Sequence, residues 1–397
     1  MVLMRRVPWA VGWILVTALF GCGESSSAGD DGSGGGSAAQ AGSGATGGAG
    51  GSATGGSATG GSTTGGSATG GSAGATGGSA GMPPTGSFPM GFGPPEPIVT
   101  GLTFPARLGM KDGYLYFTEA GLDDGTHSRL ARRAPSGNVE TLFAGNRVVA
   151  LHLDDTELFF VERGTSTVYR MSYATLEPVV FTTTTMTVAD VDRNGEMIWI
   201  TEYTSAQTNT AVSVFDRAGT LLAQPVPPSN PGFFFTYLAV GGGNVYVSTV
   251  GSNTALYKIP PSGTGGITVP SVDPQFIAAD ASHVYFTSLS DGTVLRQAHS
   301  ATMQPEELAT DQAYPFAIAV DGSGAYWTNG GDCVTAPVTG GSVMGTPLAG
   351  SAPVAVATGE RCPQAIATDA DYVYWTREAD YLTVGDDSIV RARKLLP

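Results

Sequence analysis

The sequence has little positive charge. Its 397 residues include 19 Lys and Arg against 34 Asp and Glu, which gives a formal net charge of −15 at pH 7. A nucleic-acid-binding protein needs clustered Lys and Arg to neutralise phosphates, and charge-driven docking on anionic lipid needs the same residues. The composition therefore excludes a general nucleic-acid partner and disfavours adsorption to a lipid surface through charge.

Familiar catalytic and cofactor motifs are also missing. The chain contains no G-x-S-x-G, no H-E-x-x-H, no phosphate-binding loop and no dinucleotide fingerprint. It also lacks any long stretch with the apolar stripe of a 3.6-period helix. Hydrophobic residues still make up 41% and aromatic residues 9%, which suits a folded protein. The sequence thus predicts a folded chain without long helices and assigns it no reaction.

The first residues have the pattern of an export signal. Arg5 and Arg6 precede the apolar stretch 7–21, which is shorter than the ~20 residues of a membrane span. The letters LFGC that end at Cys22 resemble a bacterial lipobox, which implies cleavage before Cys22 and lipid on its thiol. We expect 1–21 to be a signal peptide and the lipid to hold the protein in the bacterial cell envelope, on the outer membrane or cell surface. An ordinary secretory signal or an uncleaved anchor is the alternative.

Residues 22–95 are dominated by Gly, Ser, Ala and Thr, with a five-residue repeat visible as GGSATGGSATGGS. Such a composition cannot bury enough apolar surface to offset the entropy of ordering, so we expect a disordered linker. As a flexible coil it would have a root-mean-square span of roughly 45–50 Å. The linker would therefore act as a tether that holds the following domain clear of the membrane.

The chain beyond Glu96 repeats one unit seven times. The clearest copies are FIAADASHVYFTS, FAIAVDGSGAYWTN and QAIATDADYVYWTR, which begin at Phe276, Phe316 and Gln364. The copies recur about every 43 residues, a spacing typical of propeller blades. One aromatic residue anchors the second strand of each copy. The anchors are Tyr116, Phe159, Trp199, Tyr246, Tyr285, Tyr326 and Tyr374.

Each copy contains four short runs of ~4–7 residues rich in Val, Ile, Tyr, Phe and Thr and separated by Gly, Asp and Pro. The predicted fold class is therefore all-β: a seven-bladed β-propeller of four-stranded antiparallel blades over 96–397. The last copy ends after its third strand at 388–395, whereas 97–100 is a fourth strand without a blade. We expect these two segments to pair, so that the N-terminal strand closes the last blade.

Two copies resemble the YWTD repeat of low-density lipoprotein receptor propellers, in which Ile-Ala-x-Asp is followed by Tyr-Trp-Thr-Asp. The matching residues are Ile318-Ala319-Val320-Asp321 with Tyr326-Trp327-Thr328, and Ile366-Ala367-Thr368-Asp369 with Tyr374-Trp375-Thr376. The final Asp of that motif is absent here, and that family has six blades. The repeats are similar, more loosely, to NHL-like propellers and to seven-bladed bacterial lyases of the virginiamycin B type. The resemblance implies a propeller fold.

The sequence has three cysteines, of which Cys22 is assigned to lipid. Cys333 follows the second strand of the sixth copy, and Cys362 precedes the first strand of the seventh, so both loops lie on the same face. In an exported protein we expect these two cysteines to form a disulfide. Two free buried thiols are the alternative. Neither cysteine has a second Cys or His at the spacing of a zinc site.

A set of charged residues is expected on the face where the second strands end, which we call the upper face. The predicted ligand-binding residues are Glu119, Asp123, Asp124, Glu162, Glu202 and Arg377. The three glutamates occupy equivalent positions, three residues after the anchors of the first three copies, and like charges this close repel unless a cation is bound. They are therefore the candidate metal ligands, with Ca²⁺ as the candidate cofactor. Alternatively, each glutamate accepts hydrogen bonds from its own blade.

Two further candidates receive less support. The segment DVDRNG, 190–195, matches the opening of a calcium-binding loop, but its twelfth position is Thr201 rather than the required Glu, and it coincides with a hairpin turn. The four histidines fall at separate places in the propeller and are expected not to converge. The sequence thus favours a binding or scaffold module that recognises a protein, glycan or small ligand at the upper face of a monomeric propeller. The alternative is a metal-dependent lyase or hydrolase with its site at the propeller axis.

Overall fold

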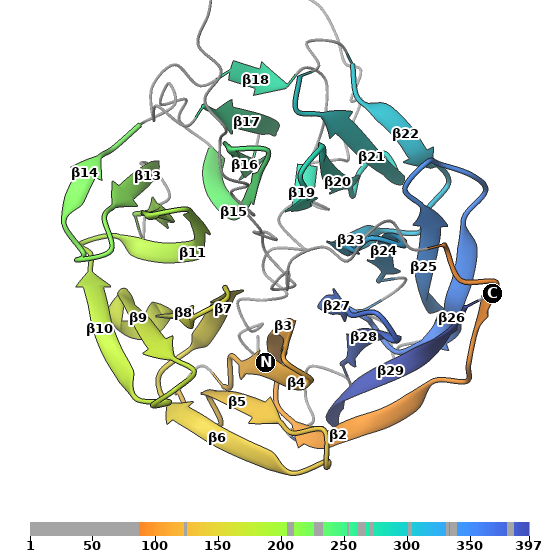
Figure 1. The fold of residues 1–397 in the computed structure, drawn as a ribbon, viewed down its shortest axis with the longest axis horizontal. Coiled ribbons are helices and arrows are strands. Elements are labelled where there is room, and N and C mark those ends of the chain that lie inside the picture. Colours follow the sequence, from red (N-terminus) through yellow and green to blue (C-terminus); the bar gives the residue numbers. More distant parts are fainter. Residues whose placement is uncertain are drawn as a thin grey trace, which may run out of the picture. The chain divides into compact units, whose positions relative to one another are not determined.

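The computed structural model describes residues 87–396, except for 123–124, 205–209, 226–232, 252–253, 261–266, 270–273, 301–303, 331–332, 334–339 and 379–384. The chain divides into two units, Met1–Ala68 and Thr69–Pro397, and all described residues belong to the second. They form seven antiparallel sheets arranged around a central axis (Figure 1). The prediction of an all-β, seven-bladed propeller with four-stranded blades is confirmed. Among these residues, no helix is long and apolar enough to cross a membrane.

The strands of blades one to six run from the axis outward in chain order. Blade one contains β3 (Pro105–Lys111), β4 (Tyr114–Glu119), β5 (Arg129–Arg133) and β6 (Val139–Ala144). Blade two contains β7 (Val148–Leu153), β8 (Glu157–Glu162), β9 (Thr167–Ser172) and β10 (Pro178–Thr183), with the short helix η1 (Arg163–Thr165) after β8. Blade three contains β11 (Thr187–Asn194), β12 (Met197–Tyr203), β13 (Thr210–Phe215) and β14 (Leu221–Ala223).

Blades four to six follow the same order. Blade four contains β15 (Phe233–Gly241), β16 (Asn244–Gly251), β17 (Ala255–Ile259) and β18 (Ile267–Val269). Blade five contains β19 (Pro274–Ala279), β20 (His283–Ser288), β21 (Thr293–Ala298) and β22 (Glu306–Ala309). Blade six contains β23 (Pro315–Val320), β24 (Gly324–Asn329), β25 (Gly341–Pro347) and β26 (Val354–Glu360). Blade seven contains β27 (Ile366–Thr368), β28 (Tyr372–Arg377) and β29 (Asp387–Leu395), together with β1 (Gly91–Phe92) and β2 (Glu96–Leu102).

In several repeats an aspartate fixes the turn between the first strand and the second. In blade seven, Asp369 Oδ1 accepts hydrogen bonds from the backbone N–H groups of Asp371 and Tyr372, at 2.9 and 2.8 Å. Its other oxygen accepts a hydrogen bond from the hydroxyl of the anchor Tyr374 at 2.7 Å. Asp280 and Tyr285 make the same contacts in blade five. The Asp and Tyr of the repeat therefore fix one hairpin turn together, which explains their regular spacing.

The threonine that follows the anchor by two residues joins neighbouring blades. Thr328 Oγ1 accepts a hydrogen bond from Ala317 N on its own inner strand and donates one to Gln364 O at the start of blade seven. Thr287 acts in the same way between blades five and six, where it donates to Phe316 O at 2.6 Å. The β-bulge in each of these inner strands leaves the amide free for the hydroxyl. The Thr of the repeat thus serves ring assembly.

The ring is closed by the N-terminal part of the propeller. Pro97 and Val99 on β2 pair with Val390 and Ile389 on β29, so the predicted closure of blade seven is confirmed (Figure 1). The structure adds β1, which pairs antiparallel with the end of β29. Phe88, just before β1, stacks on the anchor Tyr326 of blade six with the ring centroids 6.0 Å apart.

Packed residues begin at least at Phe88, before the boundary predicted at residue 96. Two aromatic residues, Phe88 and Phe92, give this segment enough apolar surface to dock, although its Gly and Pro content is that of the linker. The predicted signal peptide 1–21, the lipid site Cys22 and most of the predicted linker lie outside the described residues.

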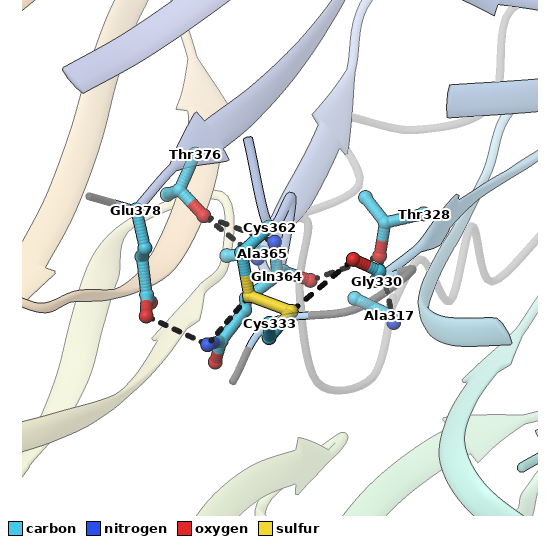
Figure 2. Close-up of a disulfide and its surroundings, with 9 residues drawn as sticks. All are labelled: Ala317, Thr328, Gly330, Cys333, Cys362, Gln364, Ala365, Thr376 and Glu378. Carbon is cyan, nitrogen blue, oxygen red and sulfur yellow. Dashed lines mark hydrogen bonds between the residues drawn. A yellow bond between two sulfur atoms is a disulfide. The ribbon is translucent and has the colours of Figure 1, made fainter. Parts of the chain in front are cut away.

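The predicted disulfide between Cys333 and Cys362 is present and joins blades six and seven, with the two Cα atoms 5.1 Å apart (Figure 2). Both cysteines are buried. Beside the disulfide, the amide of Gln364 donates a hydrogen bond to the carboxyl group of Glu378 at 2.7 Å. Burial raises the pKa of Glu378 well above its usual value, and the nearby Asp387 adds to the rise. The seam between these blades therefore holds a covalent bond and a buried carboxyl group.

Candidate functional site

The three predicted metal ligands are each bound within their own blade. Glu119, at the end of β4, accepts a hydrogen bond from Thr103 N at 2.7 Å and is paired with Arg129. Glu162, at the end of β8, accepts from Asn146 N at 2.7 Å and also from two side-chain hydroxyls. Glu202, near the end of β12, accepts a hydrogen bond from a serine hydroxyl of β13. The three side chains are buried, with 2, 7 and 3% of their surface exposed.

These contacts match the alternative interpretation, in which each glutamate holds its own blade. The glutamates lie at the ends of strands in three separate sheets, and their oxygens accept hydrogen bonds from those sheets or from adjoining loops. Within the described ranges, no group of three or more His, Cys, Asp or Glu side chains could hold a metal ion. The structure therefore does not bring the three glutamates together as metal ligands. Asp123 and Asp124 lie outside the described residues.

Arg377 lies at a rim pocket rather than at the axis. It makes two hydrogen bonds to Glu360, at 2.5 and 2.8 Å, and the indole N–H of Trp375 donates to the same carboxylate. A pocket of about 420 Å³ next to it lies between blades six and seven and is also lined by Arg361 and Asp386. These two residues form an ion pair at 3.1 Å. The charged groups of this pocket thus already have partners, and it is the weaker candidate site.

The aspartates of the DVDRNG segment hold blade four to blade three. Asp190 Oδ2 accepts a hydrogen bond from Leu238 N at 3.0 Å, and Asp192 Oδ2 accepts one from Val240 N at 3.1 Å. Both carboxylates are buried on β11 and reach the backbone of β15. Because backbone amides occupy these oxygens, the segment does not form a calcium-binding loop.

A different group of residues converges on the axis. We define the axial cluster as four residues of innermost strands, Arg107 on β3, Asp190 on β11, Tyr237 on β15 and Phe276 on β19, together with Arg163 in η1, whose charge acts on Tyr237. The guanidinium carbon of Arg107 lies 4.8 Å from the centre of the Tyr237 ring, although these residues belong to blades one and four. Figure 1 shows the innermost strands of all seven blades around the axis, so this contact crosses the ring.

The arginines of the axial cluster are incompletely bonded. Arg107 is only 8% exposed; its Nη1 donates to Ala106 O at 3.1 Å, but its buried Nε has no hydrogen-bond partner. The Nε atom of Arg163 is likewise buried without a partner. Each buried donor without a partner costs about 1–3 kcal/mol, and more on a charged group. The propeller fold does not require this cost, because the equivalent positions in three blades are alanine.

The surroundings of the axial cluster raise the pKa values of Asp190 and Tyr237. Burial raises the pKa of Asp190 to about 6, although the positive charge of Arg107 opposes the rise. Burial also raises the pKa of Tyr237, and the charges of Arg107 and Arg163 oppose it. The charges of both arginines therefore act on a phenol held on the far side of the axis.

An aromatic wall extends from Tyr237, the ring that Arg107 contacts. The rings of Tyr237 and Phe276 stack with centroids 4.1 Å apart, and Phe276 lies 4.1 Å from Phe316 of blade six. Blades four, five and six thus contribute one ring each. The axis therefore combines cationic groups from blades one and two with an apolar surface on the opposite side.

The axial cluster was not predicted from the sequence, although the repeats contain a signal for it. Four of its members precede the large inner-strand residue of their repeats, a position that the blade packing leaves free to vary. Across the seven repeats that position holds Arg107, Ala150, Asp190, Tyr237, Phe276, Ala317 and Ala365. Three alanines and four larger residues of different chemistry show that the side chain at this position differs from blade to blade.

The four histidines make separate contacts. His152 is buried and pairs with Asp192 across the seam of blades two and three, at 2.8 Å. His299 contacts the hydroxyl of Tyr246 at 2.7 Å, and His283 contacts a neighbouring serine in a hairpin turn. His127 lies exposed in a loop of blade one. None of the four is a member of the axial cluster.

Comparison with known proteins supports the fold. No family model matches the chain, and no curated protein sequence matches it significantly. Solved structures do match. A streptogramin B lyase aligns with a TM-score of 0.59 and 15% identity, over 76% of this chain and 97% of that one. Virginiamycin B lyase from Staphylococcus aureus aligns with a TM-score of 0.58 and 14% identity, over 76% and 98%.

A third match is a catalytically inactive His-to-Ala variant of the Staphylococcus aureus enzyme with quinupristin, with a TM-score of 0.57, 14% identity and coverage of 76% and 98%. At these identities the similarity establishes a common propeller architecture and no more. The chain is therefore similar in fold to virginiamycin B lyases.

Proposed function

We propose that this protein is a binding module that takes its ligand, a small molecule, a glycan or a segment of a protein, at the axial cluster. The observation that carries the proposal is the buried Arg107 on β3, whose Nε lacks a hydrogen-bond partner and whose guanidinium faces Tyr237 across the axis. A buried polar group without a partner lowers stability. Residues kept at such a cost are typical of functional sites. Binding sites in propellers and repeat proteins also often lie where several repeats meet.

We further propose that the propeller is displayed outside the cytoplasm of a bacterium, attached through lipid on Cys22 and the linker that follows. The disulfide supports this localisation, because disulfides persist in oxidising compartments and are rare in the cytoplasm. The net charge of −15 agrees with a partner other than nucleic acid. A Cys22→Ser substitution should move the protein from the membrane fraction to the soluble extracytoplasmic fraction, and unchanged membrane association would contradict the lipid anchor.

The binding site can be tested by a thermal-shift screen of a mixed library of acids, bases, neutral compounds and saccharides. Compounds that raise the Tm of the wild-type protein should bind the Tyr237→Leu variant at least about tenfold more weakly. Tyr314→Leu is the matched control, because Tyr314 is an exposed tyrosine that precedes β23 and lies outside the axial cluster. If hits depend on Tyr314 and not on Tyr237, the ligand binds elsewhere.

The alternative function is a lyase or hydrolase with its site at the axis. It is favoured by the fold similarity to streptogramin lyases and by Asp190, whose pKa of about 6 suits proton transfer near neutral pH. Incubation with quinupristin, with and without added divalent cations, followed by chromatography tests this alternative. Conversion of quinupristin would favour it, and recovery of the unchanged compound would reject it for this substrate.

A further inference from the structure

We infer that the ligand of the axial cluster is an organic oxyanion, a carboxylate or phosphate ester joined to a flat apolar group. This inference rests on the proposed function and adds the chemical class of the ligand. Three features of the cluster carry it: the two incompletely bonded guanidinium groups, the engagement of the only acidic member, and the aromatic wall on the opposite side.

The guanidinium groups supply unused donors. Each arginine has five N–H donors in a planar fork, a shape that matches carboxylate and phosphate oxygens. Arg107 donates one hydrogen bond from Nη1 to Ala106 O. The buried Nε atoms of Arg107 and Arg163 have no hydrogen-bond partner. Neither side chain forms an ion pair among the residues that the structure describes. A bound oxyanion would provide the missing acceptors and countercharge.

Asp190, the acidic member of the cluster, does not provide these missing acceptors. Asp190 is buried, and its two oxygens accept hydrogen bonds from Val191 N and Leu238 N, both at 3.0 Å. These contacts commit the carboxylate to the seam between blades three and four. Two guanidinium charges and one carboxylate leave the cluster with a net positive charge, in a protein whose overall net charge is −15. The charge of the cluster members is therefore opposite in sign to that of the whole chain, which favours an anion.

The aromatic wall indicates what the anion is attached to. Tyr237, Phe276 and Phe316 present successive rings from blades four to six, with neighbouring centroids 4.1 Å apart. Flat apolar groups stack on such surfaces, and a guanidinium group over an aromatic face favours the same geometry. A ligand with an anionic end and a flat apolar end would engage both sides of the axis at once. Inorganic anions would engage only one.

The inference can be tested on the full chain with four small probes at millimolar concentration, followed by ligand-observed NMR. The probes are benzoate, phenyl phosphate, the neutral analogue benzamide and inorganic phosphate. We expect benzoate or phenyl phosphate to bind, and benzamide and inorganic phosphate to bind at least about tenfold more weakly, since one charged hydrogen bond is worth about that factor.

Three substitutions locate the binding. Arg163→Gln, in η1, and Arg107→Gln should each weaken binding of the anionic probe at least about tenfold. Arg361→Gln, at the rim pocket where the arginine is already paired with Asp386, should leave binding unchanged. Because Arg163 is only partly buried, its variant keeps the test valid even if Arg107→Gln fails to fold.

The outcomes separate this inference from the proposed function. Equal binding of benzamide and benzoate, lost in Tyr237→Leu but kept in Arg163→Gln, would overturn the anion and leave an axial binding site. Binding that is lost only in Arg361→Gln would overturn both, because the site would be the rim pocket. Failure of both aromatic anions to bind would overturn the inference.

Discussion

Single side chains in this propeller serve either the hairpins, the seams between blades or the axis. The repeat aspartates such as Asp369 fix hairpin turns, whereas Asp190 and Asp192 hold the backbone of the next blade. The same residue type thus has two structural uses, set by its place in the strand. This distinction explains why a motif such as DVDRNG resembles a metal loop in sequence and serves blade packing in the structure.

Asp190 should make the stability of the protein depend on pH. Burial holds its folded-state pKa at about 6, above the value of 3.8 expected in the unfolded chain. Between these values the folded chain binds the proton more tightly, so the free energy of unfolding should fall as the pH rises from about 4 to about 6. Asp190→Asn removes this titration while keeping an oxygen for Leu238 N. Urea unfolding at a series of pH values should show the variant gaining stability relative to the wild type over that range, and parallel pH profiles would contradict the prediction.

Glu119, Glu162 and Glu202, which we call the rim glutamates, should act without a metal ion. Glu162→Gln should lower the free energy of unfolding by about 1–2 kcal/mol, because it weakens a buried acceptor with three donors. The loss should be equal in calcium and in chelator, measured by denaturant unfolding. Glu140→Gln, in an exposed ion pair with Arg132, is the control and should change stability by less than about 1 kcal/mol. A calcium-dependent loss at Glu162 would restore the metal site that the sequence suggested.

At the scale of elements, the closure of the ring depends on two separate N-terminal strands. The pairing of β2 with β29 could be predicted, because the last repeat lacked a fourth strand and 97–100 had the matching pattern. Strand β1 could not be predicted, since it has two residues and lies among Gly and Pro. Only its docking against Tyr326 and β29 makes this short segment part of the fold.

The docking of this segment can be measured in the full chain. Phe88→Ala should lower the free energy of unfolding by about 1–2 kcal/mol, because it removes a half-buried ring that stacks on Tyr326. Met90→Ala is the matched control, since Met90 lies on the same segment and is 77% exposed. The control should stay within about 0.5 kcal/mol of the wild type in denaturant unfolding. Equal effects of the two substitutions would mean that the segment does not dock.

At the scale of the whole molecule, the disulfide adds a covalent link between blade six and blade seven, the blade in which the ring closes. The two cysteines are separated by 29 residues. For a loop of this length, the chain-entropy model predicts a stabilisation of about 3–4 kcal/mol. Reduction should therefore lower the free energy of unfolding of the wild type by this amount, whereas a Cys333→Ser, Cys362→Ser double variant should not respond to reductant. Identical unfolding of the wild type with and without reductant would exclude a stabilising role.

The sequence by itself determined the number of blades, the anchors of their second strands, the closing strand β2 and the pairing of the two cysteines. The blade count and the anchors depend on local patterns, because strand periodicity and an aromatic residue recur in every copy, a turn aspartate recurs in most, and each copy forms a similar sheet. The face on which the second strands end also follows from strand direction alone. The sequence could place the rim glutamates there, but it could not decide whether they face one another or their own sheets.

Only the tertiary structure decided which residues meet at the axis. Arg107 and Tyr237 are distant in the chain and belong to blades one and four, so their contact exists only once the ring has closed with a particular radius and tilt of its blades. No local pattern encodes that geometry, because it is the sum of the packing between all seven sheets. The same reason applies to the glutamates, whose hydrogen-bond partners are fixed by how the strands of each blade pair.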